Sequence, residues 1–483
     1  MRNLSKLKIR NDTIETALCK RELAKNIKRG DLDQYIKQYK GKESDEDFKK
    51  RLEETYFFNK IDNIINSYVS KPFKKDFKIE EKNDDIIAKE LNENFDGQGT
   101  NVTDFLKLGL KEAFYFAQVH AFTDLIFDAN TSEISHVVNY IDISDIYDFE
   151  FNNKGELIYL RFRVEEHVRV DFEVKKFLNM REYIKKDGKV TWNDYISTTF
   201  FTKVTQKDGL AYKERSLNNP FGLNRIPFRS FYIVPVSADK KFNPDLPFLN
   251  AFELQLQHFK TASRLKYNEL VYSTASRVMQ TSNVDDNENR SIDISAKVMT
   301  VMGQDDKMYW DIPPYELIEA FRKELGEVSS EIDEIMGNIL YGKTNGTATA
   351  TENVLLNSST NNFLSSISNS LQWFAESIIE DIQEFKNLLG VEFDTSIITD
   401  YSVALNQTEV STLFQLYSIG GIALEDLFDE MKRRNIFDDY LTFTETMDKL
   451  TKEQETKMAP VVVDATVEET SNALIVKEDE GTV

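Results

Sequence analysis

The residue clusters in this sequence that come closest to a catalytic or metal-binding site are acidic. Asp124 and Asp128 are four residues apart, so on a helix they would share one face. The polar segment 285–289 (DDNEN) could supply further oxygen ligands to a divalent cation, but it lacks the spacing of a calcium-binding loop. A metal-dependent phosphodiesterase is therefore an alternative function, although surface charge is the expected role of these side chains.

The histidines and glycines complete no catalytic motif. The four histidines are His120, His136, His167 and His258, and no two of them have the spacing of a metal-binding pair. Segment 165–167 (EEH) lies in a stretch of alternating polarity, where neighbouring side chains point to opposite faces of a strand. The phosphate-binding G-x-x-x-x-G-K-[ST] loop, G-x-S-x-G and H-E-x-x-H are absent. We therefore expect no catalytic residue, no metal site and no cofactor, and a structural or binding protein instead of an enzyme.

The composition is that of a globular protein with an acidic surface. The 483 residues carry 82 acidic and 60 basic side chains, a formal net charge of −22. Tight binding of nucleic acid phosphates requires a basic surface, so an acidic chain suits a surface that DNA slides past. The single cysteine, Cys19, excludes internal disulfides and suits a reducing compartment. We expect no membrane span and no secretory signal, because apolar runs are short and the N-terminal MRNLSKLKIR is polar.

Hydrophobic periodicity predicts helices at the start of the chain and strands after them. Thr100 or Asn101 is the expected N-cap of one helix, because short polar side chains accept hydrogen bonds from the first turn. Between residues 121 and 240 the period changes to two, and turn sequences such as Asp187-Gly188 separate the segments, as in antiparallel hairpins. The expected helices lie in 13–70, at 84–92 and at 102–119, and the expected strands include 157–164, 167–174 and 198–204.

Two long amphipathic helices dominate the second half of the sequence. Helix 314–341 carries an apolar seam, and at about 1.5 Å per residue it would be roughly 40 Å long. A polar loop at 343–351 (KTNGTATAT) connects it to another long helix, whose apolar face starts at Leu364. We expect copies of the same chain, arranged in a closed circle, to cover these apolar faces. The seam, with intervals of 3, 4, 3, 4, 3 and 4 residues, consists of Ile318, Phe321, Leu325, Val328, Ile332, Ile335 and Ile339.

Several short motifs follow one another in an informative order. Tyr39-x-Gly41-x-Glu43 and Phe48-x-x-Arg51 come first, and 140–146 (YIDISDI) precedes the first predicted hairpin. Arg225-Ile226-Pro227-Phe228 and Leu405-Asn406-Gln407-Thr408-Glu409-Val410 come later. In this order the chain resembles the portal (head-to-tail connector) proteins of tailed bacteriophages. The resemblance runs through most of the chain, and it rests on the order of the segments more than on any one motif.

The resemblance implies an α+β, predominantly helical fold with wing, stem, clip and crown regions, assembled into an oligomeric ring. The strand pair of the clip is expected at 295–302 and 307–312. The implied regions are 1–246, the wing with N-terminal helices and then an antiparallel sheet; 247–278, the first stem helix; 279–312, the clip; 313–342, the second stem helix; 343–351, the tunnel loop; 352–404, the long wing helix and a return strand; 405–450, the crown helices; and 451–483, an acidic disordered tail.

The function that the resemblance implies is that of a virion structural protein. A ring of copies, twelve in this family, would occupy one capsid vertex, and double-stranded DNA would pass through its channel without sequence specificity. The expected partners are the major capsid or scaffold protein, the large terminase subunit and a neck or tail adaptor, with no membrane and with assembly in the host cytoplasm. A head-completion or scaffolding protein is the other structural alternative. The tunnel-loop residues Lys343, Thr344, Asn345 and Thr347 would project into the channel.

Overall fold

The computed structural model divides the chain into two compact units, Met1–Ser402 and Val403–Val483. Helices and antiparallel strands are both present, as expected for the predicted α+β class. Within the described ranges, no helix combines the length and the apolar composition needed to cross a bilayer. The structure describes residues 4–40, 43–81, 85–127, 134–170, 172–198, 212–237, 240–273, 276–280, 307–311, 315–340, 350–388, 391–399, 401, 414–433, 442–444 and 446–449.

Short polar side chains start the N-terminal helices. Asn11 accepts a hydrogen bond from the backbone N–H of Thr13, at 3.0 Å, at the start of the first helix. The predicted cap Asn101 accepts one from the N–H of Asp104, at 2.8 Å, so this prediction is confirmed. The helices are α1 (Asp12–Arg29), α2 (Asp45–Glu54), α3 (Lys60–Val69), α4 (Asp85–Glu93) and α5 (Val102–Phe116).

A five-stranded antiparallel sheet, in the order β4-β5-β6-β7-β8, follows the helices. Asp187 and Gly188 form the predicted turn between β6 and β7, with φ of 50° and 76°. The predicted single strand 167–174 is wrong, because β5 runs through residues 165–166 to Val170 and β6 begins at Glu173. Most side chains at this end of the ribbon are exposed, so charged residues do not interrupt the strand. The strands are β4 (Ile146–Phe151), β5 (Leu157–Val170), β6 (Glu173–Lys186), β7 (Lys189–Ser197) and β8 (Tyr212–Pro220). Of the predicted strand 198–204, only residue 198 is described.

Two smaller sheets connect distant parts of unit 1. The three-stranded sheet has the order β3-β2-β9, and β1 pairs with β12. The predicted helix 102–119 is too long, because residues 118 and 119 already belong to β2. Asp124 also lies on β2, so the expected helical face shared with Asp128 is wrong. The strands are β1 (Lys78–Glu81), β2 (Gln118–Phe127), β3 (Ile134–Ile141), β9 (Phe228–Tyr232) and β12 (Phe393–Ser396).

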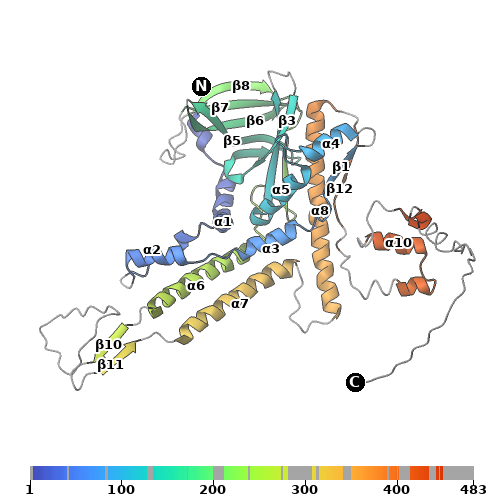
Figure 1. Cartoon of the computed structure of the whole chain (residues 1–483). Coiled ribbons are helices and arrows are strands. Elements are labelled where there is room, and N and C mark those ends of the chain that lie inside the picture. The colour runs from blue at the N-terminus through green and yellow to red at the C-terminus, as the bar shows by residue number, and fades with distance from the viewer. Residues whose placement is uncertain are drawn as a thin grey trace, which may run out of the picture. The chain divides into compact units, whose positions relative to one another are not determined.

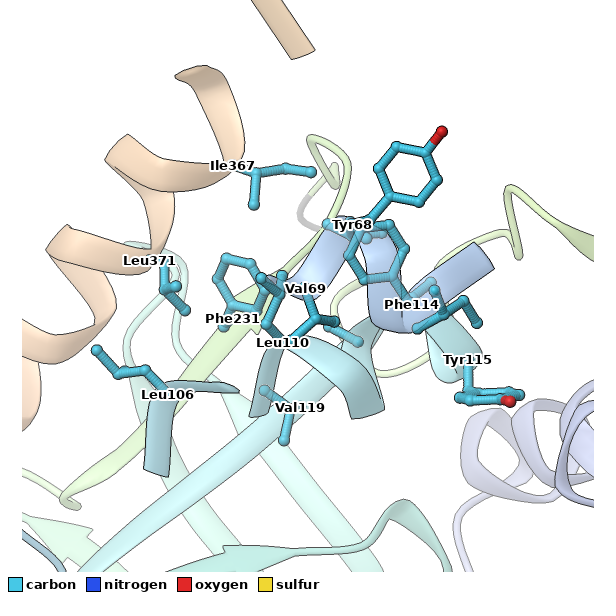
Figure 2. Close-up of a cluster of buried hydrophobic side chains, with 14 of the residues drawn as sticks. Tyr68, Val69, Leu106, Leu110, Phe114, Tyr115, Val119, Phe231, Ile367 and Leu371 are labelled. Carbon is cyan, nitrogen blue, oxygen red and sulfur yellow. The ribbon is translucent and has the colours of Figure 1, made fainter. Parts of the chain in front are cut away.

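The main hydrophobic core of unit 1 lies where α3, α5, β2, β9 and α8 (Ala350–Lys386) meet (Figure 2). Leu106, Leu110 and Phe114 lie four residues apart on α5, so they share one face, and each is at most 1% exposed. Ile367 and Leu371 reach the same cluster from α8 (Figure 2). Each fully buried side chain of this size contributes about 1.5–3 kcal/mol, so the cluster holds α8 firmly on the sheet and on α5.

Two long helices, α6 (Leu249–Ser273) and α7 (Tyr315–Leu340), lie side by side and lead to a two-stranded antiparallel ladder (Figure 1). The predicted first helix 247–278 is too long, because residues 276–278 belong to β10 (Ser276–Gln280), which pairs with β11 (Lys307–Asp311). The expected partner of β11, segment 295–302, lies outside the described residues. Helix α8 begins at Ala350, so it includes the last two residues of the predicted loop 343–351.

Unit 2 contains short helices, as predicted. Helix α10 (Leu424–Arg433) buries Leu427, Phe428 and Met431, which lie on one face. The ring of Phe428 lies 5.6 Å from that of Phe443. Gly420 has a φ of 76°, which suits glycine and makes the predicted chain break before α10. The predicted tail 451–483 lies outside the described residues.

Candidate functional site on the helix pair α6–α7

The predicted seam of α7 is mostly buried inside the same chain. Ile318, Val328 and Ile332 are at most 4% exposed. Helices α6, α3 and α8 all contact α7. The expectation that copies of the chain must cover this seam is therefore wrong for these three residues, since a 3-4 spacing predicts helix packing without identifying the partner. Phe321, Leu325 and Ile335 are half-buried, and the side chain of Ile339 lies outside the described residues.

The apolar face of α8 is covered in the same way. Leu371, Ile378 and Ile382 are at most 1% exposed. They belong to the core formed with α5, β2 and β9. Much of the apolar face of each long helix is therefore covered within unit 1.

Polar contacts join the two helices to each other and to α3. The Oγ1 of Thr261 on α6 donates a hydrogen bond to Glu324 on α7, at 3.1 Å. The ammonium group of Lys60 on α3 donates to the backbone oxygen of Ser329, at 2.7 Å, and pairs with Asp333 at 2.8 Å. The Thr261 contact therefore fixes α7 against α6, and the Lys60 contacts fix α7 against α3.

A buried ion pair between Glu43 and Arg51 holds α2 against α6. The Nε and Nη2 atoms of Arg51 donate to the two carboxylate oxygens of Glu43, at 2.6 and 2.9 Å, and both side chains are 1% exposed. Nη1 of Arg51 donates to the hydroxyl of Ser263 on α6, at 2.6 Å. The guanidinium carbon lies 4.9 Å from the ring centre of Tyr39 and 5.2 Å from that of Phe48. The residues of the two short motifs at 39–51 therefore meet around Arg51. Through Arg51 they contact α6 and support the helix pair.

The same pair sets the charge of Glu43. Burial by itself raises the pKa of this carboxyl. The hydrogen bonds from Arg51 and from the backbone N–H of Tyr39 outweigh burial, so the pKa of Glu43 lies below its ordinary value. Glu43 is therefore ionised at neutral pH, as the pair requires. Sequence reasoning singled out these residues as a motif but did not identify their contact with α6, because the contact joins residues more than 200 positions apart.

A second buried carboxylate connects α8 to the sheet. Asp381 is fully buried on α8 and accepts hydrogen bonds from Nε of Arg225, at 2.8 Å, and from Nε and Nη2 of Arg229, both at 2.7 Å. Arg229 lies on β9, and Arg225 lies in the segment that leads to it. Two guanidinium groups on one carboxylate give a directional contact, which fixes the rotation of α8 about its axis.

The surface of α7 that remains exposed is strongly acidic. The helix carries seven acidic residues and two basic ones. One of the basic residues, Lys323, lies 3.6 Å from Glu327 in an exposed pair one turn apart. The acidic side chains with the greatest exposure are those of Glu316, Glu319, Glu327, Glu331 and Glu334.

The predicted tunnel-loop residues cannot be placed beside this surface. Lys343, Thr344, Asn345 and Thr347 lie outside the described residues. They stay a prediction, and the seam residues of α7 are the predicted site residues that the structure places.

The acidic clusters considered for metal chemistry do not assemble into a site among the described residues. Within those ranges, no group of three or more metal-ligating side chains is present. Asp124 accepts a hydrogen bond from Nη1 of Arg181, at 2.6 Å. On β5, Glu165 pairs with Lys176 at 2.6 Å, and Glu166 pairs with Arg215 at 2.9 Å. Asp128 and the segment 285–289 lie outside the described residues.

The histidines are separated from one another. His120 on β2 is buried, and burial lowers its pKa to about 3. Burial also lowers the pKa of His136 on β3, whose Nε2 lies 3.2 Å from the backbone oxygen of Phe95. The pKa of His258 on α6 is lowered by burial and then by the charge of Lys60. All three lowered values favour the neutral imidazole at pH 7.

The described residues thus define a class of protein: an α+β chain with a long helix pair that ends in a strand ladder and is held by buried ion pairs. No protein-family model matches the chain, and no curated protein matches its sequence.

Proposed function

We propose that this chain is a portal protein of a tailed bacteriophage. Copies would form a ring at one capsid vertex, and the channel of the ring would serve for genome packaging and ejection. The terminase and later the neck or tail proteins would dock at the strand ladder β10–β11, and capsid or scaffold protein would contact the wing. No residue of the chain has a catalytic role in this proposal.

The observation that carries the proposal is the succession of elements in the second half of unit 1. Helix α6, the β10–β11 ladder, helix α7 and the 37-residue helix α8 follow one another. This is the order of first stem helix, clip, second stem helix and wing helix that the sequence resemblance implies. The ladder lies at one end of the helix pair (Figure 1), where a clip would contact partner proteins.

The acidic surface of α7 supports a channel role. Phosphates of double-stranded DNA would be repelled by a wall that presents Glu327, Glu331 and Glu334, and repulsion prevents salt-bridge capture of the duplex. DNA could then move along the wall without being held at fixed positions. Tight binding of DNA by the same surface is not expected.

Contacts between copies would use exposed apolar side chains outside the seam. Tyr56 is 75% exposed between α2 and α3, Trp373 is 68% exposed on α8, and Leu317 is 40% exposed near the start of α7. Large aromatic side chains are enriched in the centres of protein interfaces because they bury much area with little loss of side-chain entropy. These residues are the first candidates for contacts within a ring.

The proposal is tested by the state of assembly of the purified chain. Mass photometry should show a closed oligomer, and negative-stain electron microscopy should show rings with a central hole. The same chain, expressed with its capsid and scaffold proteins, should appear at a single vertex of the capsids. A chain that stays monomeric at every concentration and is missing from those capsids would contradict the proposal.

A further inference from the structure

The hairpin of β5 and β6 extends beyond its neighbours in the five-stranded sheet. β7 pairs with β6 only from Met180 onward, and β4 pairs with β5 only up to Phe162. Segments 163–170 and 173–179 therefore form a two-stranded arm, in which each strand pairs only with the other. At about 3.3 Å per residue, segment 173–179 spans roughly 23 Å. A two-stranded ribbon is at best marginally stable alone in water, so contact with another surface would stabilise the arm.

Phe172 lies at the tip of this arm, between the end of β5 at Val170 and the start of β6 at Glu173. Its side chain is 100% exposed, the highest value of any large apolar side chain in the described part of the chain. Val174, two residues further on, is 60% exposed. Neighbouring apolar side chains that are exposed together often mark an interaction site. The tip of the arm is therefore a candidate for insertion into a partner.

A pocket that fits such a tip opens between α1, α5 and the strands β2 and β3 of the same chain, with a volume of about 390 Å³. A cavity of about 150 Å³ is large enough for a benzene ring, so this pocket has room for a phenylalanine side chain. Leu108 lines the pocket from α5 and is 57% exposed, so part of the apolar wall is open to solvent. The apolar lining also includes Leu18, Phe116, Ile141 and Ile143.

The charge beside Phe172 is opposite in sign to the excess charge of the pocket. Four cationic side chains and two carboxylates line the pocket, so two positive charges are in excess. Arg29 is the most exposed of these cations, and it has no ion-pair partner among the described residues. Glu173 is also exposed and, within the same ranges, has no ion-pair partner. A pair between two such exposed groups would orient the contact more than it would strengthen it.

We propose that Phe172 of one copy inserts into the pocket of a second copy of this chain. The ring of Phe172 would pack against Leu18 and Leu108, and Glu173 would then lie beside Arg29. The chain itself supplies both halves of the contact, which favours a second copy over an unrelated partner. Because the two halves are different surfaces, the contact is head-to-tail, and such contacts close into a ring when the rotation between copies permits. The inference deepens the portal proposal and rests on it.

Photo-crosslinking of the assembled full-length chain locates the contact. Phe172→p-benzoylphenylalanine places a photoreactive ring at the tip of the arm. This variant is mixed with isotope-labelled unmodified chain before assembly, so mass spectrometry separates crosslinks between copies from those within one copy. Crosslinks between copies should map to peptides that contain Leu18, Leu108 or Ile143. Leu217→p-benzoylphenylalanine is the matched control, because Leu217 is 40% exposed on β8 of the same sheet, and it should give no crosslink to these peptides.

Substitutions test whether the two surfaces act together. Phe172→Ser should weaken association between copies at least about tenfold, as expected for an aromatic side chain buried in an interface. Leu108→Ser should also weaken it and leave the fold of a single copy intact, because Leu108 is already more than half exposed. The double variant should show less than the product of the two single effects, since both substitutions remove the same contact. Leu217→Ser is the control and should assemble as the unmodified chain does. Mass photometry at graded protein concentrations measures all four.

Several results would overturn the inference while rings of the unmodified chain still form. One is a set of crosslinks from position 172 that map away from the pocket, or to capsid or scaffold protein in co-expressed particles. Others are unchanged association of Phe172→Ser, or single effects that multiply fully in the double variant. The portal proposal would survive each of these results. Its own failure looks different, because the unmodified chain would then stay monomeric, and the contact between copies would be excluded with it.

Discussion

Arg51 donates one hydrogen bond to each carboxylate oxygen of Glu43, at 2.6 and 2.9 Å, in a site where both side chains are 1% exposed. The same guanidinium reaches Ser263 on α6, so a single side chain joins the loop before α2, α2 itself and the helix pair. Removing one partner of such a buried pair strongly destabilises the fold, because the other charge is left without a counterion. The position of α6 therefore depends on a residue far away in the sequence.

Replacing Arg51 by Met should lower the free energy of unfolding of unit 1 by about 3–5 kcal/mol. The double variant Arg51→Met with Glu43→Leu should be less destabilised than the single variant, because no unpaired carboxylate remains buried. Urea unfolding followed by circular dichroism measures both. Lys49→Gln is the control, since its pair with Glu53 at 3.9 Å is exposed, and a change within about 0.5 kcal/mol is expected. A double variant as unstable as the single one would contradict this view of the pair.

Replacing Asp381 by Asn should loosen α8 from the sheet. The amide keeps the shape of the side chain but leaves Arg225 and Arg229 without their buried counterion, and a loss of about 3 kcal/mol is expected. Hydrogen exchange should show faster exchange of backbone amides in α8. Glu380→Gln is the matched control on the same helix, because that side chain is 61% exposed and lies 3.8 Å or more from either arginine. Equal effects of the two substitutions would show that burial of Asp381 is unimportant.

Low pH should destabilise the fold through His120. The imidazole has an ordinary pKa near 6.5, and burial lowers the pKa in the folded chain to about 3. Between these values the unfolded state binds one more proton than the folded state, so stability present above pH 6.5 is lost as pH falls toward 3. The contribution of this one residue is up to about 1.4 kcal/mol per pH unit.

The His120→Gln variant should therefore show a shallower dependence of unfolding free energy on pH between pH 6 and 4 than the unmodified chain. Denaturant titrations at several pH values measure this slope. His167→Gln is the control, because His167 is exposed on β5, and its slope should match that of the unmodified chain. The same slope in the His120→Gln variant would mean that other groups account for the loss of stability in acid.

Local patterns in the sequence predicted local structure well. The cap Asn101 and the turn at Asp187-Gly188 were predicted because each depends on residues next to it in the chain. The periodicity of α7 likewise predicted the burial of Ile318, Val328 and Ile332, although the fully buried Met336 lies outside the predicted seam. What the pattern could not predict was the partner, and α6 covers a face that was expected to need another copy.

Contacts between residues far apart in the chain could not be predicted from the sequence. The pairing of β10 with β11 was missed because a strand of five residues has too few positions to show a period, and it directly follows a long helix. The buried residues Arg21 and His120 are 99 positions apart and belong to no motif. An arginine within an amphipathic helix is ordinarily a surface residue, so its burial could not be foreseen from spacing.

Trp373 provides a test of the proposed contacts between copies. Its side chain is 68% exposed on α8, although the neighbouring Phe374 is buried in the core at 1% exposure. If the exposed ring is covered by a second copy in a ring, Trp373→Ser should lower the fraction of closed oligomer seen by mass photometry. Aromatic residues at the centre of an interface typically contribute about 2 kcal/mol or more per contact, and a ring repeats each contact once per copy.

The stability of the single chain should change little in this variant, because an exposed side chain makes few contacts within its own copy. Asn369→Ser is the matched control, since Asn369 is exposed on the same helix one turn earlier and has no large apolar surface to bury. A ring fraction unchanged by Trp373→Ser would exclude this residue from the interface, and Tyr56→Ser would then be the next variant to measure. If neither substitution changed the ring fraction, contacts between copies would have to form without Tyr56 and Trp373.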